Sequence, residues 1–446
     1  MPSKIHSCTP TDLPSFADCA AQIMSRADEL AQHSDVSDML TRTYLTPAHH
    51  NAAAQLADWM CAAGMSVRRD AAGNVIGRYE GLAAHAPALL TGSHFDTVRN
   101  AGKYDGNLGI LLPLACVARW HAAGKRFPFA IEIIGFAEEE GVRFKATLLG
   151  SRAAAGSFDM AVLDNLDDSG LSMREVMQAS GFHPAGLAKA AYDPASVLAF
   201  VEVHIEQGPV LLNEELALGV VTAISGATRF MVEAEGLAGH AGTAPMPLRR
   251  DAAMAAAEAG LYIEKRCQGI PGLVGTVGQF TVPNGATNVV PGKAVFSIDI
   301  RAEQDVVREQ AVADVLAEIE RIADRRRVQF AVRKTHDAPS VPCAPWLQQQ
   351  VASAVQHCDL PVRHLPSGAG HDAMAMAAIT DVAMLFVRCG NGGISHHPDE
   401  IMTAEDAALA AQAFTYFAEH FTAHFPTEEQ DHESLPTTRR LDRRPL

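Results

Sequence analysis

The sequence predicts an α/β protein whose main domain is interrupted by a smaller α+β domain. Short apolar runs without alternation occur three times in the first half of the chain, each followed by polar residues, at 87–90, 129–135 and 197–203. Such runs are typical of parallel strands that are buried on both faces. The elements of residues 213–330 instead follow a β-α-β-β-α-β order, which is typical of a ferredoxin-like domain. We therefore expect a discontinuous α/β domain (1–212 and 331–425), an insertion (213–330) and a mobile tail (426–446).

The first domain begins with two predicted helices and a hairpin. Ser15–Ala31 is helical in composition and follows Pro14, a residue that suits a helix start. Ala52–Ala63 is a second, alanine-rich helix, and Val67–Tyr79 has turn glycines between β-branched stretches, as a hairpin does. The three buried strands follow. Because ligands of α/β sheets bind beyond the carboxyl ends of such strands, the polar residues after them indicate a functional site.

The insertion and the last part of the chain continue the alternation of helices and strands. In the insertion we expect the order strand, helix, strand, strand, helix, strand, at Gly219–Glu235, Asp251–Arg266, Val274–Val282, Ala294–Arg301, Gln304–Arg325 and Val328–Lys334. After it we expect two helices, a strand and a last helix, at Trp346–His357, His371–Ala378, Val382–Val387 and Ala404–Phe421. Motifs that suggest catalysis lie on both sides of the β-α-β-β-α-β unit, so we interpret this unit as an insertion.

The length and charge of the chain exclude several classes of protein. At 446 residues it is too long for one compact core, so two or three domains are expected. Its formal net charge of −16 argues against a nucleic-acid binder and against a polybasic membrane-surface protein, because both need a basic field. A small anionic substrate stays possible, since a local positive pocket can lie within an acidic protein.

Cysteine usage and hydropathy predict a soluble, cytoplasmic protein. The eight cysteines are dispersed and form no C-x-x-C pair, so reduced thiols are expected instead of a zinc ribbon or a disulfide framework. The first residues have no apolar segment of the kind that signal peptides carry. The longest apolar runs, such as Ile110–Val117, are shorter than the ~20 residues of a membrane span, so no membrane contact is expected.

The segment Thr91–Thr97 ends the first buried strand with a histidine and an aspartate. Since residues two apart in an extended segment point the same way, Asp96 can orient the ring of His94, as carboxylates do for metal-bound histidines. Further on, Asp105 precedes a glycine at the start of a predicted helix. A lone buried histidine is more often structural than a ligand, but the combination with Asp96 and Asp105 favours a metal site.

Carboxylates and amides also follow the other two buried strands. Glu138, Glu139 and Glu140 are adjacent after the second strand, and adjacent carboxylates repel one another unless water or a cation neutralises them. A solvated acidic turn would explain them. So would two separate roles, with one glutamate as a metal ligand and another as a proton relay. His204 followed by Gln207 repeats the arrangement after the third strand.

Gly-rich loops carry further histidines. Gly239–Gly242 contains His240, Ser367–Asp372 contains His371, and Gly392–Pro398 contains a histidine pair. Each of these segments alone could be an ordinary polar loop. Their recurrence in a chain with 19 histidines indicates that some of the histidines assemble into one site.

Taken together, these motifs resemble the amidase/hydantoinase/carbamoylase family. The motifs are GSHFDT, KYDGNLG, EEEGVRF, HIEQGPVL, GLAGHAGTAPM, NVVPG…DIR, SGAGHDA and SHHPDE, and they occur in the family's order between about residues 45 and 420. The family, within the aminoacylase and carboxypeptidase superfamily of two-metal hydrolases, includes N-carbamoyl-L-amino acid hydrolase, β-ureidopropionase, allantoate amidohydrolase and ureidoglycolate amidohydrolase. The resemblance implies a two-metal aminopeptidase-like catalytic domain and an inserted ferredoxin-like lid and dimerisation domain.

The resemblance also implies which residues bind the two metals. It makes His94 and His204 ligands of one ion, Glu140 and His396 ligands of the other, and Asp105 a bridge between them. The family pattern Ser-His-x-Pro selects His396, although the adjacent His397 could compete. The ions would be Zn²⁺, Mn²⁺, Co²⁺ or Ni²⁺, because the nitrogen and oxygen donors show no preference for thiolate chemistry.

Catalytic and substrate-binding roles are implied in the same way. Glu139 matches the general base and acid, and Asp96 matches the carboxylate partner of His94. Substrate contacts fall on a group of polar residues in both predicted domains, namely Gln207, His240, Asn288, Arg301 and His371. Of these, His240 is expected to reach the site of the neighbouring subunit in a homodimer and to stabilise the oxyanion there. Arg301 would bind a substrate carboxylate.

The expected reaction is hydrolysis of the C–N bond of a linear ureido acid, either allantoate or an N-carbamoyl-L-amino acid. It would proceed through a metal-bound hydroxide with Glu139 as the base. The segment around Lys103 is more similar to the allantoate-type members. Two alternatives remain open: an aminoacylase or dipeptidase on the same fold, and a catalytically silent binding or scaffold protein. A serine hydrolase is disfavoured, since the sequence has no G-x-S-x-G motif.

Overall fold

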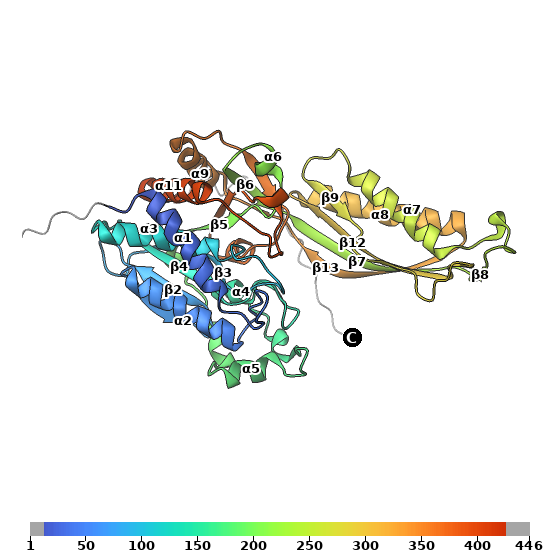
Figure 1. Ribbon diagram of the computed structural model, residues 1–446, viewed down its shortest axis with the longest axis horizontal. Coiled ribbons are helices and arrows are strands. Elements are labelled where there is room, and N and C mark those ends of the chain that lie inside the picture. Colours follow the sequence, from blue (N-terminus) through green and yellow to red (C-terminus); the bar gives the residue numbers. More distant parts are fainter. Residues whose placement is uncertain (1–12, 425–446) are drawn as a thin grey trace, which may run out of the picture.

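The computed structural model describes residues 13–424, which form two sheets with separate cores (Figure 1). The larger sheet has nine strands in the order β1-β2-β4-β3-β5-β16-β6-β14, with β15 beside β6. The central strands β4, β3, β5 and β16 are parallel, and β3 and β4 are buried throughout, as predicted. The strands are β1 (Ser66–Arg69), β2 (Val75–Tyr79), β3 (Ala88–His94), β4 (Ala130–Phe136), β5 (Val197–Ile205), β6 (Leu218–Ile224), β14 (Val341–Pro342), β15 (His364–Ser367) and β16 (Val382–Val387).

Helices cover both faces of the larger sheet. The long helices share one core on one face: α1 (Phe16–Ala31), α2 (Pro47–Ala62), α3 (Leu108–Ala122), α9 (Pro345–His357) and α11 (Ala404–His420). The short helices α4 (Leu149–Ala154) and α10 (Ala373–Met376) pack on the other face. Two more short helices, α5 (Met173–Ala179) and α6 (Val210–Asn213), lie in connecting segments.

The smaller sheet is antiparallel, in the order β10-β12-β7-β13 with β9 beside β12. Its elements occur in the predicted β-α-β-β-α-β order: β7 (Gly226–Glu235), α7 (Ala252–Cys267), β9 (Leu273–Thr276) with β10 (Phe280–Thr281), β12 (Lys293–Ala302), α8 (Asp305–Arg326) and β13 (Gln329–Ala338). The strand pair β8 (Gly239–His240) and β11 (Val289–Val290) lies at the end that is remote from the larger sheet (Figure 1). We call residues 226–338 the small domain and the remaining described residues the large domain.

The boundaries of the small domain differ from the predicted 213–330. The predicted strand 219–235 is two strands, because β6 pairs with β16 in the larger sheet and the smaller sheet starts only with β7. Between them, a Cβ at Gly226 would lie only 2.7 Å from the backbone nitrogen of Ser340, besides meeting the Arg308 guanidinium, so the crossover needs a glycine. At the other end, β13 continues to Ala338. An alternating pattern marks a strand but does not show which sheet the strand joins.

Most other elements lie within a few residues of their predicted ranges. The main exception is the predicted helix 371–378, which is reduced to the four residues of α10. The proposed tail, 426–446, lies outside the described residues. None of the helices within residues 13–424 has the length and hydropathy that crossing a bilayer requires.

Candidate metal and active site

Parallel strands bring four of the predicted motifs to one edge of the larger sheet. His94 is the last residue of β3, the glutamate turn 138–140 follows β4, and His204 is the next-to-last residue of β5. His396 lies in the loop after β16, which runs parallel to β5. Because all four strands point the same way, the polar residues at their carboxyl ends meet, as the sequence predicted.

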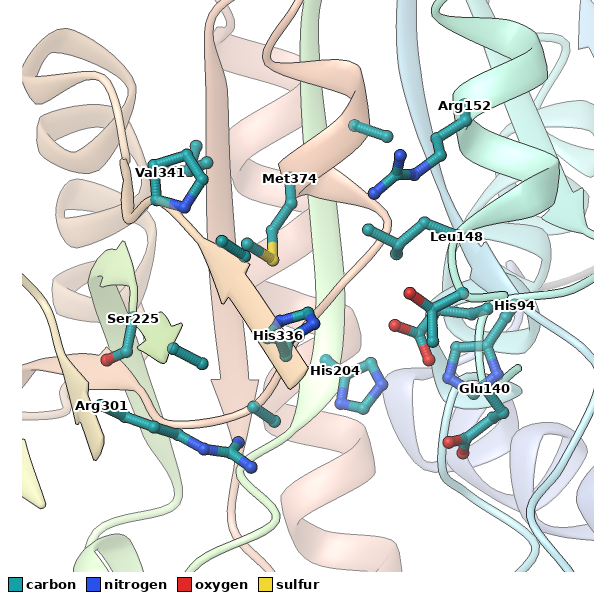
Figure 2. A pocket seen from close by; sticks show the side chains of 18 of the residues that line it. His94, Glu140, Leu148, Arg152, His204, Ser225, Arg301, His336, Val341 and Met374 are labelled. Atoms are coloured by element: carbon teal, nitrogen blue, oxygen red, sulfur yellow. The ribbon is translucent and has the colours of Figure 1, made fainter. Parts of the chain in front are cut away.

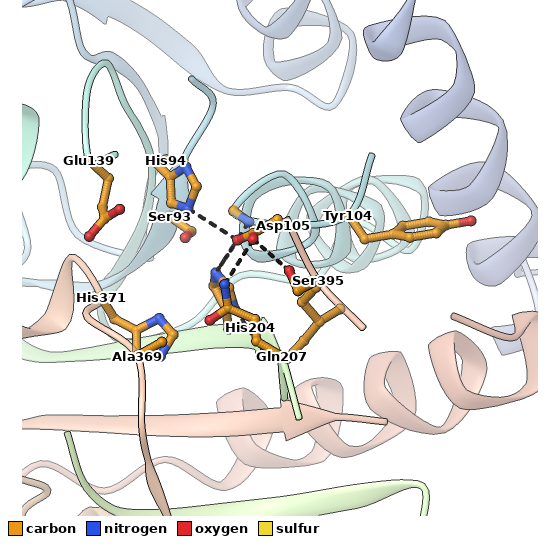
Figure 3. Close-up of polar contacts among 12 residues, drawn as sticks. Ser93, His94, Tyr104, Asp105, Glu139, His204, Gln207, Ala369, His371 and Ser395 are labelled. Atoms are coloured by element: carbon orange, nitrogen blue, oxygen red, sulfur yellow. Dashed lines mark hydrogen bonds and ion pairs between the residues drawn. The ribbon is translucent and has the colours of Figure 1, made fainter. Parts of the chain in front are cut away.

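Asp105 lies at the centre of these side chains (Figure 3). Its Oδ1 atom is 3.5 Å from His94 Nε2 and 3.3 Å from His204 Nε2. Its Oδ2 atom is 3.3 Å from His396 Nε2, which is itself 3.4 Å from Glu140 Oε1. Four groups of potential metal ligands lie here, and Asp105 belongs to two of them, one with His94 and His204 and one with Glu140 and His396. This is the grouping that the motifs implied for two ions joined by one carboxylate.

The chemistry of these donors fits divalent cations. Asp105 Oδ1 is buried and has no hydrogen-bond partner among the described residues, which is costly for a carboxylate oxygen. Burial alone would raise the pKa of Asp105, but the close contacts with the three histidines outweigh it and hold that pKa well below its usual value. Burial and the neighbouring Asp105 raise the pKa of Glu140 to about 7. A cation would neutralise this crowding of carboxylates.

Asp96 connects His94 with the glutamate turn. Its Oδ1 atom is 3.5 Å from His94 Nδ1, and its two oxygens accept the backbone N–H groups of Glu139 and Glu140 at 3.0 and 3.2 Å. Asp96 thus contacts His94, as the spacing predicted, and it also ties β3 to the turn after β4. Burial and the adjacent Glu140 raise the pKa of Glu139 well above its usual value. Glu139 is therefore a carboxyl group suited to accepting a proton.

Glu400 and Ser395 hold the Asp105 loop, although the motifs implied no role for either residue. Glu400 Oε1 accepts the backbone N–H groups of Tyr104 and Asp105 at 2.9 and 3.1 Å. Ser395 Oγ lies 2.8 Å from both Asp105 Oδ2 and Glu400 Oε2. Since Ser395 and Glu400 flank His396 in the sequence, these bonds connect the His396 loop with the Asp105 loop.

His396 and His397 have different surroundings. The backbone at His396 is left-handed, with φ 55°, and its ring faces Asp105 and Glu140. His397 instead accepts the backbone N–H of Asp399 at its Nδ1 atom, 3.2 Å away, and its ring contacts neither Asp105 nor Glu140. The geometry therefore favours His396 over His397 as the ligand.

The site opens into a cavity of about 440 Å³ between the two domains (Figure 2). Side chains of the metal groups line one part of it, including His94, Glu140 and His204. The small domain contributes a polar wall with Arg229, Arg301 and His336. A cavity of this size suits a small molecule.

Arg301 faces this cavity but is largely engaged within the small domain. Its Nε and Nη2 atoms donate to the two oxygens of Asp299 at 3.0 and 2.8 Å, and its Nη1 donates to the Gly368 carbonyl at 2.7 Å. Arg229 also pairs with Asp299, at 3.0 Å. Since a guanidinium has about five N–H donors, Arg301 keeps about two for a ligand.

The other predicted substrate residues lie at different distances from the cavity. Gln207 lines it and donates to Asp105 Oδ2 at 2.8 Å. His371 is buried behind His204, with ring centroids 4.5 Å apart, and its Nε2 is 2.7 Å from Ser367 Oγ. His240, on β8, and Asn288, whose carbonyl accepts the Ala241 N–H, lie at the remote end of the small domain (Figure 1). The structure therefore does not bring those two to the metal groups of their own chain.

Sequence reasoning missed several cavity residues. Arg152, Arg229 and His336 lie on α4, β7 and β13, far apart in the chain and outside every motif quoted above. Lone arginines and histidines on helices and strands are usually ordinary surface residues, so no local signal distinguishes these three. By contrast, Glu400 stands within SHHPDE and could have been found from that motif.

Parallel strands with histidines and carboxylates gathered at their carboxyl ends, beside a cavity between two domains, define a candidate metallohydrolase. The chain belongs to peptidase family M20/M25/M40, whose sequence profile matches residues 90–420. It is 39% identical over 431 residues to the allantoate deiminase of Arabidopsis thaliana, covering 89% of this chain and 82% of that protein. It is also 39% identical over 373 residues to the N-carbamoyl-L-amino acid amidohydrolase of Geobacillus stearothermophilus, covering 84% and 91%.

Solved structures agree with this assignment. The crystal structure of an amidase of the hydantoinase/carbamoylase family from Burkholderia multivorans is 31% identical, with a TM-score of 0.84, and the match covers 89% of this chain and 96% of that one. The resemblance to the amidase/hydantoinase/carbamoylase family is therefore confirmed.

Proposed function

We propose that this protein hydrolyses the C–N bond of a linear ureido acid, either allantoate or an N-carbamoyl-L-amino acid. The observation that carries the proposal is the arrangement of His94, His204, His396 and Glu140 around Asp105, beside Glu139 and at the bottom of the cavity. Relatives that are named for these two kinds of substrate match most of the chain at equal identity, which supports the substrate class.

The ligand set supports two divalent ions, Zn²⁺, Mn²⁺, Co²⁺ or Ni²⁺. His94 and His204 would hold one ion, Glu140 and His396 the other, and Asp105 both. When bound, such a pair polarises a carbonyl oxygen and lowers the pKa of water. Glu400 and Ser395 contribute by fixing the Asp105 loop through the contacts described above.

Glu139 is proposed to move the proton. Its backbone is fixed by Asp96, its side chain lines the cavity, and its pKa is raised, which makes its carboxylate a stronger base toward water. It would then pass that proton to the leaving nitrogen. Asp96 contributes by orienting both His94 and the glutamate turn.

The substrate is proposed to lie between the two domains. Gln207 is within reach of the reacting group, and Arg301 offers its remaining N–H groups to the substrate carboxylate. His371 supports the ring of His204 from behind, so it would act on the substrate only through that histidine or after a rearrangement.

We further propose that the protein works as a homodimer and that the small domain is both the lid and the dimerisation domain. His240 and Asn288 lie far from their own metal groups (Figure 1), so their proposed substrate contacts would be made in the site of a second copy. The free thiols of the cysteines within residues 13–424 support a cytoplasmic location.

Product release from a panel of substrates tests the proposal, measured as ammonia for the ureido acids and as acetate for the N-acetyl amino acids. Allantoate, N-carbamoyl-L-amino acids, N-carbamoyl-β-alanine and N-acetyl amino acids would be compared with the metal-loaded protein. We expect turnover of allantoate or of an N-carbamoyl-L-amino acid, and we expect this turnover to be lost after chelation.

A Glu139→Gln variant is the matched control. It should keep its metal but lose about 10²–10⁴-fold in kcat. Cleavage of N-acetyl amino acids alone would instead indicate an aminoacylase. If no substrate is turned over, the protein would be a binding protein.

A further inference from the structure

One wall of the cavity has no role in the proposed function. It belongs to the large domain and lies across from the small-domain wall that carries Arg301 (Figure 2). Leu148 and Met374 make it largely apolar, and Arg152 is the one arginine or lysine among the described lining residues of the large domain. The wall therefore combines an apolar surface with a single guanidinium group.

The backbone of Arg152 is fixed although its side chain is exposed. Arg152 N–H donates to the Leu148 carbonyl at 2.8 Å, and the Arg152 carbonyl accepts the Ser157 N–H at 2.8 Å. The residues on either side of it in α4, Ser151 and Ala153, are buried against the large domain. Helix α4 thus presents the guanidinium to the cavity from a rigid support.

No carboxylate within residues 13–424 pairs with Arg152. This distinguishes it from Arg229 and Arg301, which share Asp299 on the opposite wall. Its exposed guanidinium is hydrated in the free protein, and its donors need another acceptor once a ligand displaces that water. A ligand oxygen would meet that need.

We propose that Arg152 selects substrates that carry a second oxygen-bearing arm, such as a second ureido group, on the carbon next to the carboxylate. The inference rests on the proposed function. That carbon bears the reacting ureido group, which would face Asp105, and the carboxylate, which would face Arg301. The remaining substituent then faces the wall of Leu148, Met374 and Arg152. The two apolar side chains fit the body of the arm, and the guanidinium donates to its terminal carbonyl or carboxylate oxygen.

The alternative occupant of this wall is a purely aliphatic arm, as in N-carbamoyl-L-leucine. Such an arm would suit Leu148 and Met374 but would leave the Arg152 donors without an acceptor. An oxygen-bearing arm satisfies both parts of the wall, so the structure favours it.

Steady-state kinetics of wild type and an Arg152→Met variant test this inference. The substrates are N-carbamoylglycine without an arm, allantoate and N-carbamoyl-L-asparagine with oxygen-bearing arms, and N-carbamoyl-L-leucine with an aliphatic arm. The variant should lower kcat/KM for the oxygen-bearing substrates, relative to N-carbamoylglycine, by about 10–100-fold. The same ratio for N-carbamoyl-L-leucine should stay constant or rise. The matched control is Arg174→Met, since Arg174 pairs with Asp164 on the surface outside the cavity.

Three results would overturn the assignment of Arg152. An equal loss for all substrates, N-carbamoylglycine included, would mean that Arg152 binds the carboxylate or acts structurally. An unchanged ratio would mean that it does not contact the arm. A wild type that prefers N-carbamoyl-L-leucine to N-carbamoyl-L-asparagine would contradict the proposed selectivity. If the wild type hydrolyses none of the four, the proposed function itself fails and the inference falls with it.

Discussion

Asp105 explains why cations would stabilise this site. It is a buried carboxylate at the start of α3, it contacts three histidines, and one of its oxygens has no other partner within residues 13–424. Its neighbour Glu140 adds a further negative charge, and burial opposes charge on both groups. Histidine protons can neutralise such a cluster, but two divalent ions would do so more completely and would leave the histidines neutral and coordinating.

The adjacent residues His396 and His397 provide a matched pair for a metal-binding test. A His396→Ala variant should bind about one divalent ion per chain where the wild type binds about two, and should lose its activity, because a two-metal site needs both ions. His397→Ala should keep both ions and near-normal activity, since His397 contacts Asp399 outside the site. Elemental analysis of the dialysed proteins measures the metal content. If only the His397→Ala variant loses an ion, His397 and not His396 is the metal ligand.

The metal loops depend on contacts between elements that are distant in sequence. Arg42 is fully buried, and its guanidinium donates to the Phe95 carbonyl at 2.6 Å, to Asn107 Oδ1 at 2.9 Å and to the Leu30 carbonyl at 2.8 Å. It thus connects the end of α1 with the loop after β3 and with the start of α3. Burial lowers its pKa to about 10, so it stays charged at neutral pH. One side chain therefore holds both the His94 loop and the Asp105 loop.

An Arg42→Met variant should lower the free energy of unfolding by about 2–4 kcal/mol, because it leaves several buried acceptors without donors. Urea unfolding of the metal-free protein measures this effect without a contribution from metal binding. The control is Arg363→Met, which removes an exposed ion pair with Glu214 and should cost about 0–1 kcal/mol. Equal effects of the two substitutions would show that Arg42 does not hold these elements together.

Strand β6 shows the limit of element-level prediction. The predicted strand 219–235 joins β6 to the next strand, yet β6 is buried at nearly every residue and pairs with β16, whereas β7 pairs with β12. The chain crosses from one sheet to the other between them, next to Gly226. An apolar pattern indicates that a segment is an extended strand. Which strand it pairs with depends on residues that are far away in the sequence.

The elongated arrangement of the two domains makes the proposed homodimer testable. His240 lies at the end of the small domain that is remote from the metal groups (Figure 1). If it acts in the site of a second copy, then mixing Glu139→Gln with His240→Ala, each inactive alone, restores activity. In a mixed dimer the subunit with an intact Glu139 receives an intact His240 from its partner.

Random exchange of subunits makes half of the dimers mixed, each with one intact site, so about a quarter of wild-type activity is expected. The measurement is ammonia release after unfolding and refolding the mixture, with each variant refolded alone as the control. Activity no greater than the sum of the two controls would mean that His240 does not act across the interface.

The sequence alone was sufficient for the parallel strands, for the polar residues at their ends and for the family. These features are local: a strand buried on both faces has a continuous apolar run, and His94, Glu139, Glu140 and His204 follow such runs directly. The same locality made Asp96 predictable as the neighbour of His94.

Other features needed the tertiary structure. The remote position of His240, the burial of His371 behind His204, the crossover at Gly226 and the approach of Arg152 to the cavity all join segments that are far apart in the chain. Their positions depend on how the sheets and domains pack. A single sequence indicates which residues are buried but does not show which residues they pack against. An arginine such as Arg152 therefore looks like an ordinary surface residue until the fold places it in the cavity opposite Arg301.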